Sequence, residues 1–277
     1  MSLHVDRYAG SGSPLIFIHG WGMHGGMWGD VLVRLADQFR VSAVDLPGHG
    51  YSNRMQDSDR KGLPRTPKEP SPKLSREGCR TLNAIVDELA DQFQDELTIC
   101  GWSLGGQVAL RWAMRYPEQA SRLVLVSSTP CFVRKEGWPS AMAAHTLSEF
   151  SAALQQDYAA TLRRFLALQL RGGEKEREHL AVLRRSLMSR GIPDMAALQA
   201  GLEILNDVDL RADLSGIHQR TLVIAGDCDT LTPLPASQYM VEQMPDARLA
   251  RISGAAHAPF LSHPEEFVKQ VTGFLHE

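Results

Sequence analysis

The 277-residue sequence predicts an α/β protein with a doubly wound, mostly parallel sheet and a helical cap inserted between late strands. Three observations predict this class. Short, continuous apolar runs recur along the chain, as expected of parallel strands that are buried on both faces. Segments with helical patterning separate several of these runs. One long stretch, residues 129–206, contains helical segments but no clear strand.

The predicted strands and core helices follow one another along the chain. The strands are the runs "LIFI" at 15–18, "VSAV" at 41–44, "LTIC" at 97–100, "LVLVSS" at 123–128, "TLVIAG" at 221–226 and "RLARIS" at 248–253. The helices between or after them are "MWGDVLVRLADQF" at 27–39, "LGGQVALRWAMRYP" at 104–117, "PASQYMVEQMP" at 235–245 and "PEEFVKQVTGFLHE" at 264–277. This alternation is typical of a doubly wound sheet.

The stretch at 129–206 interrupts the alternation. It holds amphipathic segments such as residues 147–170 and 174–191. A helical insertion between two strands of a parallel sheet is placed to cover an active site. We therefore divide the chain into a first core part at 1–128, a helical cap at 129–206 and a second core part at 207–277.

A second interruption, residues 55–76, reads "MQDSDRKGLPRTPKEPSPKLSR". It is rich in Pro, Lys, Arg and Ser and has few apolar side chains, so it cannot bury enough surface to offset its ordering entropy. We predict an exposed, mobile loop that is either simply solvated or docks a partner.

Composition excludes several functional classes. The chain is 43% hydrophobic and 22% charged with a net charge of −3, which gives no electrostatic basis for binding nucleic acid. No apolar run approaches the ~18 residues that cross a bilayer, and the start lacks the pattern of a signal peptide. The four cysteines are far apart and form no C-x-x-C, so neither zinc nor a disulfide framework is indicated. We expect a cytoplasmic monomer that binds no membrane.

The sequence "GWSLGG" at 101–106 carries the strongest chemical signal. It is G-x-S-x-G between a predicted strand and a predicted helix, which is the setting of a nucleophile elbow. Gly101 and Gly105 let the strand and the helix approach without Cβ clashes. Ser103 is thereby exposed at a helix N-terminus, where free N–H groups favour developing negative charge.

A serine nucleophile needs a base and an acid, and both follow in the order that this elbow predicts. The loop after the strand at 221–226 supplies Asp229, which we favour, and Asp227 as the alternative. The loop after the last strand supplies His257, whereas His263-Pro264 has the pattern of a helix start. Two backbone donors are also needed for the oxyanion. We expect them to be the N–H groups of Leu104 and of Trp21, in the glycine-rich loop "HGWGMHGG".

That loop also fits another pattern. Gly20, Gly22 and Gly25 spell G-x-G-x-x-G, and Asp45 lies 20 residues further on, as in a dinucleotide-binding fingerprint. Asp45 opens the segment "DLPGHGYS", however, and the elbow, acid and histidine follow later. The glycines therefore indicate an oxyanion loop, and we expect neither a cofactor nor a metal.

Together with these motifs, "SSTPCF" at 127–132 and "RFLALQ" at 164–169 resemble the α/β-hydrolase superfamily, and more narrowly its pimeloyl-[acyl-carrier protein] methyl ester esterases of biotin synthesis. The resemblance covers nearly the whole chain; the segment at 55–76 departs from it. It implies an α/β-hydrolase fold and a serine carboxylesterase that frees the pimeloyl carboxylate and methanol. It implies Ser103 as nucleophile, His257 as base and Asp229 as its orienting partner, with Trp21 and Leu104 lining the substrate carbonyl.

The resemblance also implies roles for the cap. The acyl chain would contact Phe165, Leu166, Ala167, Leu168 and Gln169. The acidic acyl carrier protein would dock on basic side chains, namely Arg164, Arg177, Arg184 and Arg185. Alternatively, the residues at 165–169 are ordinary core of the cap, and the four arginines belong to a solvated helix face.

Three alternative functions are weighed against this one. A general short-chain carboxylesterase, acting on small esters, or a C–C bond hydrolase would use the same triad, and only the cap separates them. A dehalogenase or epoxide hydrolase would need an aspartate where Ser103 stands. A non-catalytic binding module usually lacks a triad member, and this chain has all three.

Overall fold

The computed structural model describes residues 3–52 and 81–277, and its centre is a seven-stranded sheet in the order β1-β3-β2-β4-β5-β6-β7. All neighbouring strands are parallel except β1, which pairs antiparallel with β3 at the edge. The strands are β1 (Val5–Arg7), β2 (Pro14–Ile18), β3 (Arg40–Val44), β4 (Leu97–Trp102), β5 (Ala120–Val126), β6 (Arg220–Gly226) and β7 (Ala247–Ile252).

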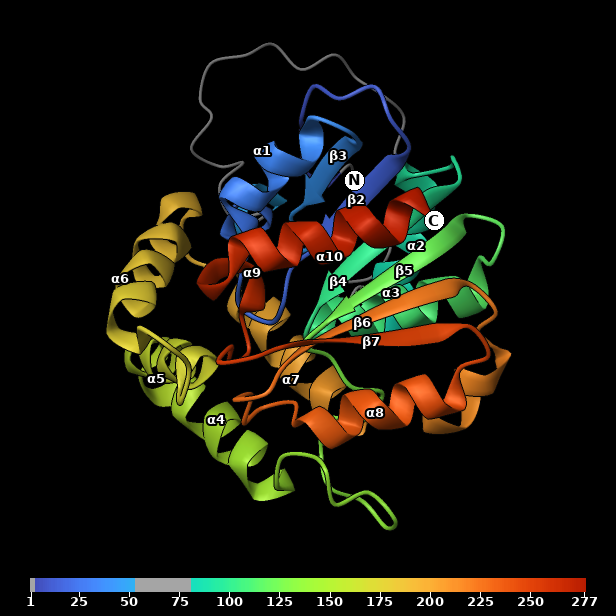
Figure 1. Cartoon of the computed structure of the whole chain (residues 1–277). Coiled ribbons are helices and arrows are strands. Elements are labelled where there is room, and N and C mark those ends of the chain that lie inside the picture. Colours follow the sequence, from blue (N-terminus) through green and yellow to red (C-terminus); the bar gives the residue numbers. More distant parts are fainter. Residues whose placement is uncertain (1–2, 53–80) are drawn as a thin grey trace, which may run out of the picture.

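Helices cover both faces of this sheet, with α1 and α10 packed together on one face and α2 and α3 on the other (Figure 1). The core helices are α1 (Asp30–Ala36), α2 (Leu82–Gln92), α3 (Leu104–Arg115), α8 (Leu234–Gln243), α9 (Pro259–Ser262) and α10 (Pro264–His276). Short 3₁₀ segments are η1 (Gly25–Trp28), η2 (Gly50–Ser52), η5 (Met188–Arg190) and η6 (Arg211–Gly216).

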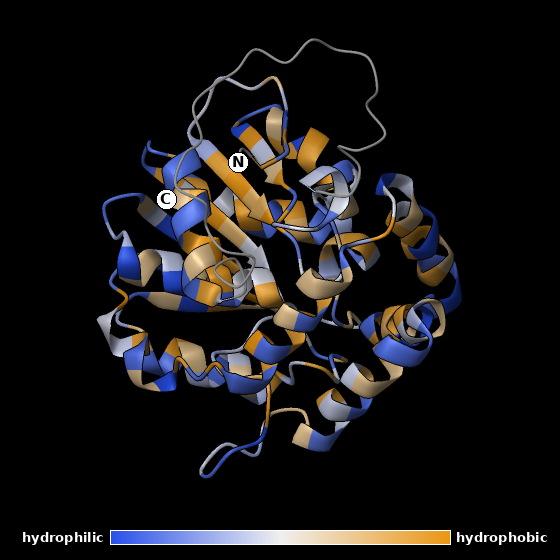
Figure 2. Ribbon diagram, turned by 180° about the vertical axis from the view of Figure 1, so that it is seen from behind, coloured by the Kyte–Doolittle hydropathy of each residue, from blue (hydrophilic) through white to orange (hydrophobic). Residues whose placement is uncertain are grey.

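The central strands are continuous apolar runs because both of their faces are buried. Every residue of β4 is buried, and apolar residues concentrate on the strands (Figure 2). An aromatic cluster of Trp28, Trp102, Phe260 and Phe267 joins η1, which follows β2, to the end of β4 and to α9 and α10, which follow β7. Close aromatic packing therefore holds the segments that follow these strands in place.

Four helices lie between β5 and β6 and form the cap, beside the sheet in Figure 1. They are α4 (Ala144–Gln156), α5 (Tyr158–Leu170), α6 (Glu176–Leu187) and α7 (Met195–Asp207). The amphipathic segment at 147–170 is thus two helices. Its break is at Asp157, whose side chain accepts a hydrogen bond from the N–H of Ala160 at 2.9 Å and so caps α5.

The predicted fold class is confirmed, including the inserted helices. All six predicted strands are present, and the three-residue β1 was not predicted because it is too short to show a periodicity. The proposed loop at 55–76 lies outside the described residues. Within the described ranges no helix is both long and apolar enough to cross a membrane, and no group of three or more His, Cys, Asp or Glu side chains could hold a metal ion.

Candidate active site

Ser103 lies in the sharp turn between β4 and α3. Its φ is +56°, in the left-handed region that side chains other than glycine rarely adopt. The turn is enforced by close approaches: a Cβ on Gly101 would lie 2.2 Å from the carbonyl oxygen of Gly105, and one on Gly105 would lie 2.3 Å from that of Ile18. A strained residue held this firmly is typical of a functional site.

His257 and Asp229 form a buried pair beside this turn. Nδ1 of His257 lies 2.8 Å from Oδ2 of Asp229, and both side chains are almost completely buried. The other oxygen of Asp229 accepts the N–H groups of Leu231 at 2.8 Å and Thr232 at 2.9 Å. Because a carboxylate only accepts, Nδ1 carries the proton and Nε2 is left as the basic nitrogen.

Burial raises the pKa of Asp229, but the charge of His257 and hydrogen bonds from His257 and Thr232 outweigh it and hold the pKa below its ordinary value. Asp229 is therefore ionised at neutral pH. The Nε2 atom of His257 is buried and has no hydrogen-bond partner in the described part of the chain. An unpaired buried base of this kind is available to take a proton.

Backbone contacts join the histidine loop to the elbow. The indole N–H of Trp102, which precedes Ser103, donates to the carbonyl of His257 at 2.8 Å. The hydroxyl of Ser128 donates to the carbonyl of Ser103, also at 2.8 Å. The ends of β4, β5 and β7 are thus tied together at one edge of the sheet, as parallel topology predicts.

The loop after β2 brings Trp21 to the same place. Met23 N–H donates to the Gly20 carbonyl at 3.2 Å, which makes a turn with Trp21 and Gly22 at its centre. Gly22 has φ +70°, the left-handed value that this position of a type II turn requires. A Cβ on Gly20 would lie 3.2 Å from that of Ser103, so the loop touches the elbow.

Both expected oxyanion donors have suitable backbone positions. The N–H of Trp21 is not used by the turn, and Leu104 is the first residue of α3, whose N–H has no partner within the helix. The Trp21 side chain is buried, and its indole N–H donates to the carbonyl of Leu198 on α7 at 2.7 Å. The cap thus holds the residue that would present one donor.

The two alternative residues are engaged elsewhere. Asp227 accepts from Arg251 at 2.8 Å and from the N–H of Gly254 at 2.8 Å; Arg251 first, and then this N–H and Ser253, lower its pKa to about 2. His263 is the N-cap residue of α10, 4.0 Å from Glu174. Within the described residues, the side chain of neither residue makes a hydrogen bond or ion pair with His257 or Asp229.

The cap residues of the predicted acyl site lie on α5. Phe165, Leu166 and Gln169 are buried, whereas Ala167 and Leu168 are half-buried. Phe165 packs edge-on against Trp21, with 4.7 Å between the ring centroids. The backbone carbonyl of Gln169 accepts from the N–H of His257 at 2.9 Å. Helix α5 thus contacts both the oxyanion loop and the histidine loop.

The four predicted docking arginines are exposed on the cap. Arg164 lies on α5, with its guanidinium 5.3 Å from the ring centroid of Phe150, and Arg177, Arg184 and Arg185 lie on α6. None of the four makes an ion pair within residues 3–52 and 81–277. Their charges are available to a partner.

One residue in contact with the buried pair, Thr232, was not identified from the sequence, and Asp45 has a role other than the one its pattern suggested. The hydroxyl of Thr232 donates to Asp229 Oδ2 at 2.6 Å and lies 3.3 Å from Nδ1 of His257. The signal for it was the Asp-x-x-Thr spacing, because a carboxylate readily binds the backbone and hydroxyl three residues on. Asp45, the acid of the dinucleotide pattern, is fully buried and binds Gly25 and Arg190, which leaves no oxygen for a ribose.

Comparison with known proteins identifies the family of this chain. Residues 15–270 match the model of the Alpha/beta hydrolase family. A pimeloyl-[acyl-carrier protein] methyl ester esterase of Nitrosomonas europaea is 42% identical over 96% of this chain and 97% of its own length. The protein of that name from Nitrosospira multiformis is 38% identical over 99% and 98%.

Among solved structures, an esterase from Exiguobacterium antarcticum superposes with a TM-score of 0.81 and 22% identity, covering 99% of this chain and 96% of that one. This likeness concerns the fold. The family match and the full-length relatives carry the assignment: the chain belongs to the alpha/beta hydrolase family and groups within it with the pimeloyl-[acyl-carrier protein] methyl ester esterases.

Proposed function

We propose that this protein is a serine carboxylesterase of biotin biosynthesis. It hydrolyses the methyl ester of pimeloyl-[acyl-carrier protein], which frees the carboxylate of the pimeloyl chain and releases methanol. The observation that carries the chemistry is the buried His257–Asp229 pair beside the strained elbow of Ser103. The full-length relatives support the substrate.

In the proposed reaction, Ser103 Oγ attacks the ester carbonyl while Nε2 of His257 takes the hydroxyl proton. The N–H groups of Trp21 and Leu104 stabilise the resulting oxyanion. Methanol then leaves with the proton from His257, and the acyl group remains on Ser103. Water, activated by the same nitrogen, hydrolyses the acyl-enzyme and restores the serine.

Asp229 fixes the tautomer and orientation of His257. Its bond to Nδ1 keeps the proton there and turns Nε2 toward the reaction, and its negative charge stabilises the imidazolium that forms. The bonds from Leu231, Thr232 and the Thr232 hydroxyl hold the carboxylate still. The low pKa of Asp229 keeps this charge throughout the neutral range.

The cap would select the substrate. Phe165, Leu166, Ala167, Leu168 and Gln169 line the proposed acyl site, and the exposed arginines of α5 and α6 face an acidic carrier. Exposed charges that lack partners in the protein are suited to steering an oppositely charged protein. We further propose a cytoplasmic monomer whose cap spans residues 129–206.

The test uses the full-length protein and Ser103→Ala. Wild type should hydrolyse the carrier-bound methyl ester and a p-nitrophenyl ester and should react with a fluorophosphonate probe, and Ser103→Ala should lose all three with an unchanged circular dichroism spectrum. A variant that kept wild-type turnover would refute the nucleophile. If wild type prefers small esters to the carrier-bound ester, it is a general carboxylesterase instead.

A further inference from the structure

The dinucleotide-like pattern contains an acid whose purpose the proposed reaction leaves unexplained. Asp45 follows β3 and is fully buried. Its Oδ1 accepts the backbone N–H of Gly25 at 2.6 Å, and its Oδ2 accepts that of Tyr51 at 2.8 Å. One carboxylate thus joins the loop after β2, which contains Trp21, to the loop after β3.

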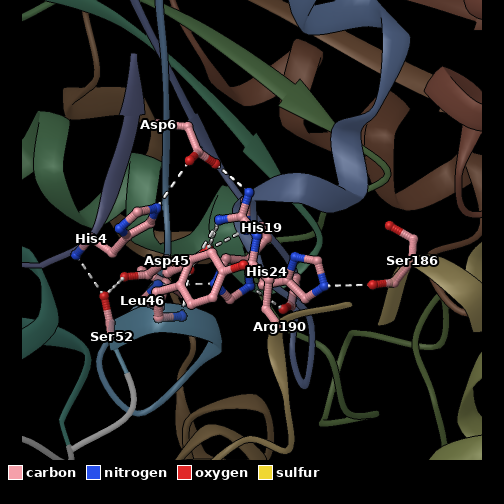
Figure 3. Close-up of polar contacts among 12 residues, drawn as sticks. His4, Asp6, His19, His24, Asp45, Leu46, Ser52, Ser186 and Arg190 are labelled. Carbon is pink, nitrogen blue, oxygen red and sulfur yellow. Dashed lines mark hydrogen bonds and ion pairs between the residues drawn. The ribbon is translucent and has the colours of Figure 1, made fainter. Parts of the chain in front are cut away.

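The charge of Asp45 is matched by a residue of the cap. Nη1 of Arg190, in η5, lies 3.1 Å from both carboxylate oxygens, and Nη2 contacts Asp6 of β1 (Figure 3). Only 11% of the Arg190 side chain is exposed. A Cβ on Gly26 would lie 2.9 Å from Nη2, so the guanidinium packs directly against the backbone of the loop after β2.

Other contacts from the cap converge on the same loop. His24 Nε2 lies 2.9 Å from the carbonyl of Ser186 on α6, and the Trp21 indole donates to the Leu198 carbonyl on α7. His19 Nδ1 donates to the Gly20 carbonyl at 2.8 Å while its Nε2 accepts the Leu46 N–H at 3.0 Å. The segment from 19 to 26 is therefore held at both ends and from the cap side.

We propose that Arg190 is a positioning residue for the oxyanion hole. Through Asp45 it fixes the N–H of Gly25, and through direct packing it fixes Gly26, so the turn that presents the Trp21 N–H keeps its place. The seating of the cap and the geometry of the oxyanion hole are thereby coupled. This inference rests on the proposed function, because it assumes that Trp21 binds the oxyanion.

The expected effect follows from how sharply catalysis depends on such geometry. Without the guanidinium, the fully buried carboxylate keeps two backbone donors among the described residues, those of Gly25 and Tyr51, and the loop must move to solvate it. A displacement of about 1 Å in a catalytic group can lower the rate about 100-fold. The loss falls on kcat, because the oxyanion is absent from the bound ester and forms only in the tetrahedral intermediates and the transition states that lead to them.

The experiment measures hydrolysis of a p-nitrophenyl ester and inhibition by phenylboronic acid, whose serine adduct places an oxygen in the oxyanion hole. Arg190→Met should lower kcat about 10- to 100-fold with KM within about threefold of wild type. The affinity for phenylboronic acid should fall by a similar factor. Arg190→Lys keeps the charge but cannot bind Asp45 and Asp6 through two separate nitrogens, so it should recover part of both losses.

Arg211 offers a matched control. It binds Asp209 through two nitrogens, at 2.9 and 2.8 Å, and lies over the ring of Trp138, as Arg190 lies over that of Tyr51. Arg211 makes no contact with the loop after β2 within the described residues. Arg211→Met should therefore leave both kcat and the phenylboronic acid affinity within about twofold of wild type.

The double variant Arg190→Met/Asp45→Asn removes both charges. It replaces Arg190→Met in the kinetic test if Arg190→Met alone does not fold. It should fold and remain about 10- to 100-fold slower in kcat. A folded Arg190→Met or double variant with wild-type kcat and inhibitor affinity would overturn the inference, as would a loss confined to KM. Failure of the proposed function is seen separately, as ester hydrolysis that is absent from wild type or survives in Ser103→Ala.

Discussion

The edge of the core that holds Ser103 and the outer face of the cap differ in whether their polar groups have partners. At the edge, the carboxylate of Asp229 has a hydrogen bond for every oxygen and the backbone of Ser103 is forced by close contacts. On the cap, Arg177, Arg184 and Arg185 are exposed and make no ion pair within the described residues.

The proposed function accounts for this difference, because it assigns bond-making to the edge and recognition of a carrier protein to the cap. Bond-making requires groups that stay in place, because a rate falls steeply when a reacting atom is misplaced. Recognition of a charged protein requires charges that are not already neutralised. Substitutions at the edge should therefore change the rate for every ester, whereas substitutions on the cap face should change only the rate for the carrier-bound one.

The largest effect is expected at the edge, for Asp229→Asn. The amide keeps the size of the side chain but can donate to Nδ1 of His257, which favours the wrong tautomer and leaves Nε2 protonated. We expect kcat to fall ~10⁴-fold for both the carrier-bound ester and a p-nitrophenyl ester. Steady-state kinetics on the two substrates measures this, and a loss restricted to one of them would contradict the assignment of Asp229.

The sequence predicted the parts of the edge that depend on local chain geometry. The elbow could be found because Gly101 and Gly105 must lack a Cβ for the turn to close. The pairing of Asp229 with His257 could be predicted because parallel strands deliver their following loops to one edge, so that order along the chain becomes proximity in space.

Contacts between segments that are distant in the chain could not be predicted from the sequence, because local patterns do not record them. Arg190 and Asp45 are separated by 145 residues, and no periodicity or spacing records that they meet. The glycine pattern was visible, and the elbow, acid and histidine that follow it already favoured an oxyanion loop over a dinucleotide site, but nothing in the sequence showed what Asp45 binds. That contact is seen only in the packing of η5 against the loop after β2, where Arg190 lies against Asp45 and Gly26.

A second prediction tests the other side of the comparison. Arg164→Glu/Arg177→Glu places negative charge on the cap face, where repulsion from an acidic carrier should weaken encounter. We expect kcat/KM for the carrier-bound ester to fall about 100-fold, equal to about 2.7 kcal/mol, and that for a p-nitrophenyl ester to stay within about twofold. Raising the salt concentration should shrink the wild-type advantage.

The matched control for this pair is Arg7→Glu/Arg40→Glu. These arginines are also exposed but lie on β1 and β3 and not on the cap helices α4 to α7. The control carries the same change in net charge, so it should alter turnover of the carrier-bound ester far less. Equal losses in the two double variants would assign the effect to overall charge rather than to docking.

The smallest effect concerns stability and is confined to the core loops. Burial lowers the pKa of His49, and burial together with the nearby His49 lowers that of His19 further. Both are therefore neutral in the folded protein at a pH where the unfolded chain already binds protons. The free energy of unfolding should fall as the pH drops below about 6.5, by up to about 1.4 kcal/mol per pH unit for each histidine.

Urea unfolding between pH 7.5 and 5.5 measures this slope in wild type, His49→Gln and His218→Gln. His49→Gln removes one group that must stay neutral, so its stability should depend less steeply on pH even if the variant is less stable at pH 7.5. His218 is exposed, and replacing it should leave the slope unchanged. If the slope is the same in all three proteins, the acid sensitivity does not originate in the loops that hold Trp21 and Asp45.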